Sequence, residues 1–130
     1  MKHLTPAEAF LFLKENSKAI LIDCRSEIEF HYVGHPIGAM QIAWNDGPNW
    51  EINPNFASEV TWFLSGDKSR PVILICRSGH RSVDAANVLI ANGFIDVYNI
   101  LEGFEGDLDS SNHRGTLGGW RKAGLPWEQS

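Results

Sequence analysis

The fold is decided by the stretch Pro71-Val72-Ile73-Leu74-Ile75-Cys76-Arg77-Ser78-Gly79-His80-Arg81-Ser82. Its first five residues are an unbroken apolar run, which is typical of a strand buried on both faces of a parallel sheet. Ser82 can cap a following helix, which we expect to run to about Asn92 and to end at Gly93. Residues 76–81 then form a loop between a strand and a helix, at the sheet edge where open α/β folds bind ligands.

The rest of the chain alternates strands and helices in the same way. The clearest start signal comes from Thr5 as a helix cap, Pro6 at the first helical position and Glu8 completing a capping box. Further strands are predicted at 19–23, 39–43 and 96–100, helices at 6–16, 27–30, 56–64 and 120–123, a turn at 34–38, and loops at 44–54 and 101–118. This alternation predicts the α/β class, with a central, mainly parallel sheet and helices on both faces.

Size and composition exclude several classes of protein. A chain of 130 residues, 43% hydrophobic and 21% charged, predicts one globular domain over residues 1–130. The net charge of −5 argues against nucleic acid or an anionic membrane as a partner. No apolar stretch approaches the roughly 20 residues of a membrane span, and no secretory signal is visible. Two cysteines make no disulfide framework, so we expect a reducing, cytoplasmic location.

The loop provides what a reactive cysteine needs. A thiolate forms where hydrogen-bond donors and positive charge surround the sulfur. The loop N–H groups can turn toward the Cys76 sulfur, Gly79 permits tight curvature, and the following helix presents its N-terminal end. Arg77, Arg81 and His80 add charge nearby. We therefore predict a lowered pKa for Cys76, against the alternative of a small buried hydrophobic residue at a strand end.

The loop Cys76-Arg77-Ser78-Gly79-His80-Arg81 resembles the active-site loop of rhodaneses, the thiosulfate sulfurtransferase family. The resemblance covers essentially the whole chain. The family usually has the turn Gly-His-Ile-Pro-Gly-Ala, in which this chain has Pro36 and Ile37 in the reverse order. The chain also has an apparent insertion, Phe104 to Leu117. The other motifs that carry it are Leu21-Ile22-Asp23-Cys24-Arg25, Glu29-Phe30, Gly34-His35-Pro36-Ile37-Gly38-Ala39, Leu101-Glu102-Gly103, Gly118-Gly119-Trp120 and Gly124-Leu125-Pro126.

The resemblance implies a two-step sulfur transfer. The Cys76 thiolate takes a sulfane sulfur from a donor such as thiosulfate and passes it, as a persulfide, to cyanide, a thiol or a sulfur-carrier protein. The loop N–H groups, Arg77 and Arg81 would stabilise the anionic donor and the persulfide. No metal and no organic cofactor is needed, and the histidines show no metal-ligand spacing. The inserted segment 104–117 leaves the sheet at the Cys76 edge, where a protein acceptor would dock.

Two other functions stay open. Dual-specificity phosphatases also use a cysteine loop with an arginine, but that arginine lies one position further from the cysteine, where this chain has Ser82. The shorter loop suits one sulfur atom better than a phosphoryl group. A non-catalytic interaction module is the third possibility, although inactive members of the family typically lack the cysteine.

Residues outside the loop have supporting roles in this interpretation. We expect Asp23 and Arg25 to form a structural ion pair that braces the active-site loop. Cys24 is predicted to lie in the core; a role as a resolving thiol stays open, since nothing in the sequence places it near Cys76. Trp44 and Trp50, in the loop 44–54, are candidates for an apolar wall of the site, with core packing as the alternative.

Overall fold

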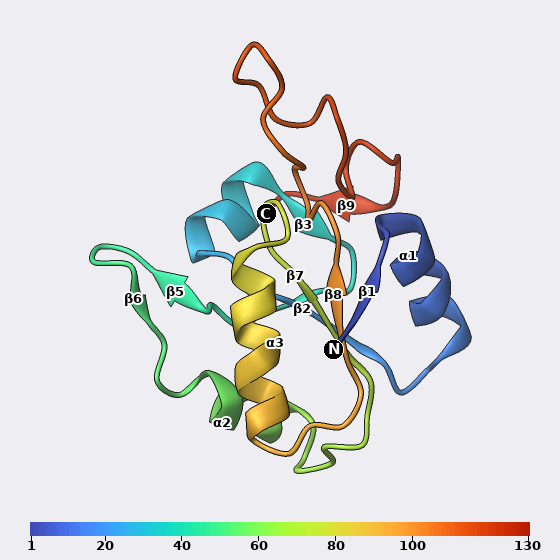
Figure 1. The fold of residues 1–130 in the computed structure, drawn as a ribbon, viewed down its shortest axis with the longest axis vertical. Helices are drawn as coiled ribbons and strands as arrows, with labels where there is room; N and C mark the ends of the chain where they lie inside the picture. The colour runs from blue at the N-terminus through green and yellow to red at the C-terminus, as the bar shows by residue number, and fades with distance from the viewer.

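The computed structural model describes residues 1–130, and a five-stranded sheet forms its centre (Figure 1). Every pair of neighbouring strands in it is parallel. The order is β1 (Lys2–Leu4), β8 (Val97–Ile100), β7 (Val72–Ile75), β2 (Ile20–Asp23) and β4 (Met40–Gln41). The predicted α/β class is confirmed. Strand β1 escaped prediction because it has only three residues, none of them buried, and no apolar pattern.

Helices cover both faces of the sheet, as predicted. Helix α1 (Pro6–Glu15) packs on one face, whereas α2 (Phe56–Phe63) and α3 (Arg81–Ala91) pack on the other (Figure 1). The capping box of α1 is present: the Thr5 N–H donates to Glu8 Oε1 at 2.8 Å, and the Glu8 N–H donates to Thr5 Oγ1 at 3.2 Å. The longest helix, α3, has 11 residues, and no helix has the length and apolar character of a membrane span.

Several connections differ from the prediction. The short helix expected over residues 27–30 is present, but from Glu29 it continues as the π-helix η1 (Glu29–Val33), three residues beyond the predicted end. The predicted loop 44–54 contains a two-stranded hairpin, β5 (Asn45–Asp46) and β6 (Glu51–Ile52), and the turn near Gly34 contributes β3 (His35–Pro36), which pairs with β9 (Trp127–Glu128). Each of these strands has two residues, too few to show an alternating pattern.

Residues 120–123 form turns, so the helix predicted there is wrong. Glycines close to both ends leave room for only one turn, which is too short for a run of helical hydrogen bonds. The chain instead bonds locally, from the Ala123 N–H to the Gly119 carbonyl at 3.0 Å and from the Gly124 N–H to the Arg121 carbonyl at 3.1 Å. Helix α3 also starts two residues earlier than expected, with His80 rather than Ser82 at its N-cap position.

The segment after β8 contains no helix or strand, as predicted for residues 101–118, but it begins in the core. Phe104 is fully buried against the sheet face that α1 covers. Its N–H donates to the Cys76 carbonyl at 2.8 Å, and the Glu105 N–H donates to the Arg77 carbonyl at 2.9 Å. Residues 103–105 therefore hold the first two residues of the Cys76 loop, and the part of the segment beyond them rises above that end of the sheet (Figure 1).

Gly103 lies where this segment and the Cys76 loop approach each other most closely. Its φ is +60°, and a Cβ there would overlap the Cys76 carbonyl oxygen and the Arg77 carbonyl group. Gly38 is a matched control, because its φ is +88° and open space surrounds the position that a Cβ would take. We expect Gly38→Ala to lower the free energy of unfolding by about 1 kcal/mol, from backbone strain alone. Gly103→Ala should cost about 1–3 kcal/mol more, from overpacking. Chemical denaturation measures both, and equal losses would contradict the close approach.

Candidate active site

The Cys76 sulfur lies in the curve of its loop, at the carboxyl end of β7. The side chain is 1% exposed. The N–H groups of Gly79 and Ser82 donate to the sulfur at 3.2 and 3.4 Å, and the Ser82 hydroxyl lies 3.2 Å from it. Gly79 has a φ of +99°, which a residue with a side chain rarely adopts. The predicted inward turn of the loop amides is confirmed for these two groups.

Ser82 begins a chain of hydrogen bonds that leads away from the sulfur. Its hydroxyl lies within hydrogen-bond distance of both the Cys76 sulfur and Asn99 Oδ1, and its one proton is donated to one of them at a time. Asn99 Nδ2 lies 3.2 Å from His3 Nδ1. Ser82 and Asn99 are buried, whereas His3 on β1 is exposed. The buried serine is thus anchored to β8, and its oxygen is held beside Cys76.

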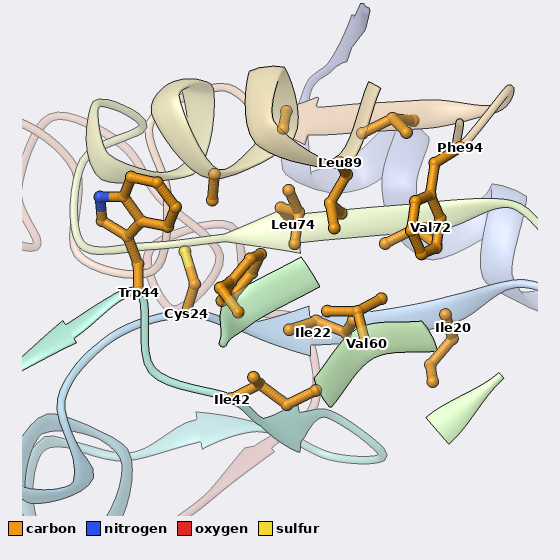
Figure 2. Close-up of a cluster of buried hydrophobic side chains, with 14 of the residues drawn as sticks. Ile20, Ile22, Cys24, Ile42, Trp44, Val60, Val72, Leu74, Leu89 and Phe94 are labelled. Carbon is orange, nitrogen blue, oxygen red and sulfur yellow. The ribbon is translucent and has the colours of Figure 1, made fainter. Parts of the chain in front are cut away.

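Cys24 lies directly beside Cys76, which the sequence did not indicate. Strands β2 and β7 pair in parallel through Asp23 and Ile75, and the ladder continues from the Cys24 N–H to the Ile75 carbonyl at 3.0 Å. Both cysteines belong to the core on the α3 side of the sheet. Figure 2 shows Cys24 in line with Ile20 and Ile22, its sulfur directed to the side of the sheet that Leu74 occupies.

These contacts decide the ionisation of the two thiols. The neighbouring Cys24 thiol, which also lies 3.4 Å from the Ile75 carbonyl oxygen, the Ser82 hydroxyl and the two backbone N–H groups all favour a thiolate on Cys76. Together they outweigh burial and lower the pKa of Cys76 to about 5. The same contact with Cys76, together with burial, raises the pKa of Cys24 well above its usual value. The predicted lowering is thus present, but hydrogen bonds rather than arginine charges produce most of it.

Arg81 is tied to Glu29 rather than free for a ligand. Its Nη1 and Nη2 donate to Glu29 Oε1 and Oε2 at 2.8 and 2.9 Å. Burial would raise the pKa of Glu29, but Arg81 and Ser26 lower it to about 2, so the carboxylate stays ionised. The pair ties the first residue of α3 to η1. Arg81 therefore differs from the sequence prediction, which gave it the anionic donor as its partner.

The predicted ion pair between Asp23 and Arg25 is present and fully buried. Arg25 Nη2 lies 2.6 Å from Asp23 Oδ2, and it also donates to the Gly34 carbonyl at 2.5 Å. The guanidinium carbon lies 4.6 Å from the centre of the Phe104 ring. The pair therefore supports the Cys76 loop only indirectly, through Phe104, whose N–H bonds the Cys76 carbonyl.

A cavity of about 680 Å³ opens beside the loop. Arg77 and Arg114 line it, and neither guanidinium takes part in an ion pair. One nitrogen of Arg114 donates to the Gly106 carbonyl at 2.8 Å, which leaves its other nitrogens available. Trp50, half-exposed in the hairpin connection, also lines the cavity, whereas Trp44 packs in the core against Phe56. Of the two tryptophans proposed as walls, only Trp50 has that position.

The remaining predicted residues have clear positions. Ser78 is partly buried in the loop and His80 is exposed. His35 holds its turn, because Nδ1 lies 2.8 Å from the Phe30 carbonyl. No group of three or more histidine, cysteine or acidic side chains is arranged to hold a metal ion.

The sequence analysis missed the roles of Glu29, Asn99 and Arg114, because each role depends on a partner that lies far away in the chain. Of the three residues, only Glu29 belongs to one of the motifs that indicated the family.

Comparison with known proteins identifies the family. A family model described as Rhodanese-like domain matches residues 6–109. The chain belongs to the rhodanese-like domain family. This rhodanese-like chain is similar to the crystal structure of Rv0390 from M. tuberculosis, with a TM-score of 0.87 and 38% identity over 100% of this chain and 98% of that one.

Two curated relatives of the rhodanese-like chain are also similar along most of their length. Uncharacterized protein RC0915 of Rickettsia conorii is 32% identical over an alignment of 134 positions that covers 98% of each protein. Thiosulfate sulfurtransferase GlpE of Haemophilus influenzae is 29% identical over 105 residues, which cover 81% of this chain and 86% of GlpE. The family resemblance predicted from the motifs is therefore confirmed, and with it the rhodanese-like fold.

The ionisation of Cys76 can be followed directly. Thiolate absorbance in the ultraviolet should rise with a midpoint near the pKa of about 5, with the thiol dominant below it and the thiolate above it. Ser82→Ala should move the midpoint upward by about one pH unit, since a hydrogen bond to a charged group contributes roughly 1.5 kcal/mol. Ser78→Ala is the control, because its side chain makes no bond to the sulfur. An unshifted midpoint in Ser82→Ala would exclude the hydroxyl as a donor.

Proposed function

We propose that this chain is a sulfurtransferase that carries sulfane sulfur as a persulfide on Cys76. The observation that supports it is a buried cysteine with a pKa of about 5, which accepts hydrogen bonds from two backbone N–H groups and lies beside the Ser82 hydroxyl and the Cys24 thiol. Such a sulfur is an anionic nucleophile at neutral pH, and the same donors favour an anionic persulfide. Family membership and the similarity to GlpE agree with this chemistry.

The proposed reaction has two displacements. The Cys76 thiolate attacks the sulfane sulfur of thiosulfate; a sulfur–sulfur bond forms, the sulfur–sulfur bond of thiosulfate breaks, and sulfite leaves with the electron pair. A thiophilic acceptor, which is cyanide, a thiol or a sulfur-carrier protein, then attacks the outer sulfur, and Cys76 leaves as the thiolate. The reaction needs neither a metal nor an organic cofactor, and it needs a reducing compartment such as the cytoplasm.

Arg77 and Arg114 are the groups we assign to the anionic part of the donor. Both line the cavity beside the loop, and neither is neutralised by a carboxylate within ion-pair distance. Arg81, in contrast, is occupied by Glu29 and holds the loop in place. The cavity is larger than a thiosulfate ion requires, which supports a protein acceptor whose chain end enters it, with the exposed part of the segment 104–117 as the docking edge.

Phosphatase chemistry fits this geometry less well. It requires an arginine that grips the phosphoryl oxygens beside the nucleophile, but Arg81 has both terminal nitrogens on Glu29. The position where a phosphatase has its arginine is held by Ser82, whose hydroxyl lies between Cys76 and Asn99. We therefore expect negligible turnover of an aryl phosphate.

Intact-mass spectrometry tests the proposed intermediate. After treatment with thiosulfate and rapid desalting, the wild-type chain should gain the mass of one sulfur atom, and a reductant should remove it. Cys76→Ser should gain none. If none of the three donors thiosulfate, polysulfide and an organic persulfide produced a reducible adduct, the proposal would be contradicted. Turnover of an aryl phosphate that disappears in Cys76→Ser would favour the phosphatase instead.

Steady-state kinetics test the role of Arg114. Arg114→Ala should lower kcat/KM for thiosulfate about tenfold, mainly through a higher KM, because a charge-assisted contact of about 1.5 kcal/mol is lost. Arg70→Ala is the matched control, since Arg70 donates to the Lys18 carbonyl and does not line the cavity. Equal kcat/KM values in the two variants would remove Arg114 from the donor site.

A further inference from the structure

The two cysteines of the chain form a neighbouring pair across two strands. The parallel register ends at Asp23 and Ile75, so Cys24 and Cys76 follow as the next pair. Neighbouring strands lie about 4.8 Å apart, and a disulfide requires Cα atoms about 4.4–6.8 Å apart. Both side chains project to the same face, since both join the core of Ile22 and Leu74. The spacing and direction therefore permit a bond between the two sulfurs.

The pair is sealed from solvent on its core side. Cys24 is 0% exposed and Cys76 is 1% exposed. The cavity opens on the side of Arg77, beyond the loop. Arg77 and Arg81 of the loop line the cavity, whereas Cys76 lies behind them. In the proposed persulfide, the inner sulfur adjoins Cys24, and we expect the outer sulfur to extend through the loop toward the cavity.

From this arrangement, and given the persulfide proposed above, we infer a second activity: Cys24 releases the bound sulfur as hydrosulfide. The Cys24 sulfur attacks the inner sulfur of the persulfide. The Cys24–Cys76 bond forms, the bond between the inner and outer sulfurs breaks, and the outer sulfur leaves with the electron pair and takes up the Cys24 proton, so that it is released as hydrosulfide. The sulfane sulfur is reduced, and the two cysteines are oxidised to a disulfide. An external dithiol regenerates both thiols and completes a sulfane-sulfur reductase cycle.

The ionisation states of Cys76 and Cys24 are consistent with these two different roles. Cys76 is the thiolate that meets the donor first, and Cys24 keeps its proton until a leaving group can accept it. The position of Cys24 compensates for its weak nucleophilicity, because the attacking and accepting sulfurs are already adjacent. An acceptor in solution and Cys24 thus compete for the same persulfide by attacking different sulfur atoms.

A single-turnover experiment without acceptor separates the two activities. The protein is loaded with thiosulfate, desalted anaerobically and followed by intact mass and by a sulfide assay. In the wild-type chain, the adduct should decay to a species two hydrogens lighter than the reduced protein, with one sulfide released per chain and a Cys24–Cys76 crosslink in peptide maps. In Cys24→Ser, which keeps a hydrogen-bond donor of similar size, the adduct should persist at least about tenfold longer.

The outcomes are distinguishable. Equal decay in the wild type and Cys24→Ser, or sulfide release without the lighter species, would overturn the role of Cys24 and leave the persulfide itself intact. No adduct on either protein would overturn the proposed function, and with it this inference. Cys24→Ala is the second variant, and circular dichroism with the adduct yield shows that each variant has folded. A dithiol added after the single turnover should restore two free thiols in the wild type.

Discussion

A buried anionic sulfur is stable only if donors surround it, and this requirement organises the molecule around Cys76. Four groups that favour a thiolate meet there from three parts of the chain: the Gly79 N–H from the loop, the Ser82 N–H and hydroxyl from α3, and the Cys24 thiol after the end of β2. Loss of any one of these elements would leave a desolvated charge with less compensation. The strand register, the positive φ of Gly79 and the start of α3 are therefore parts of one electrostatic arrangement.

Positive charge has a different role here from the one that its sequence spacing indicated. Arg81 and Arg25 lie in or beside the signature motifs, yet each is neutralised by a carboxylate, Glu29 and Asp23 respectively. A buried or half-buried arginine that is paired with a carboxylate fixes local geometry more than it adds positive potential at the site. Arg81 joins α3 to η1, and Arg25 joins the turn at Gly34 to the Phe104 ring. The free cations at the site come instead from Arg77 and Arg114.

The elements that local sequence determines were predictable. The apolar run 72–75 gave a central strand, the capping box at Thr5 gave the start of α1, and the loop with Cys76 gave the family. The features that the sequence did not predict depend on partners far away in the chain. The two-residue strands exist only because another segment lies beside them, and Phe104 is in the core, where its N–H meets the Cys76 carbonyl. The contact between Cys24 and Cys76 needs the register of β2 and β7, which no local pattern contains.

Access to the sulfur is also a consequence of the sheet. In a parallel sheet, the connections that leave the carboxyl ends of the strands gather at one edge, and here they build the walls of the cavity: η1, the β5–β6 hairpin and residues 105–114. The opposite side of Cys76 is closed by the core that Cys24 and Trp44 share. We therefore expect a ligand to approach from the wall side, past Arg77 and Arg81, because Cys76 itself is 1% exposed and does not line the cavity. A sulfur bound to Cys76 would face the loop and the cavity at its outer end and the Cys24 thiol at its inner end. Two features therefore determine what can react with that sulfur. The three connections that wall the cavity control the approach of an external acceptor, and the register of β2 and β7 fixes the position of the Cys24 thiol.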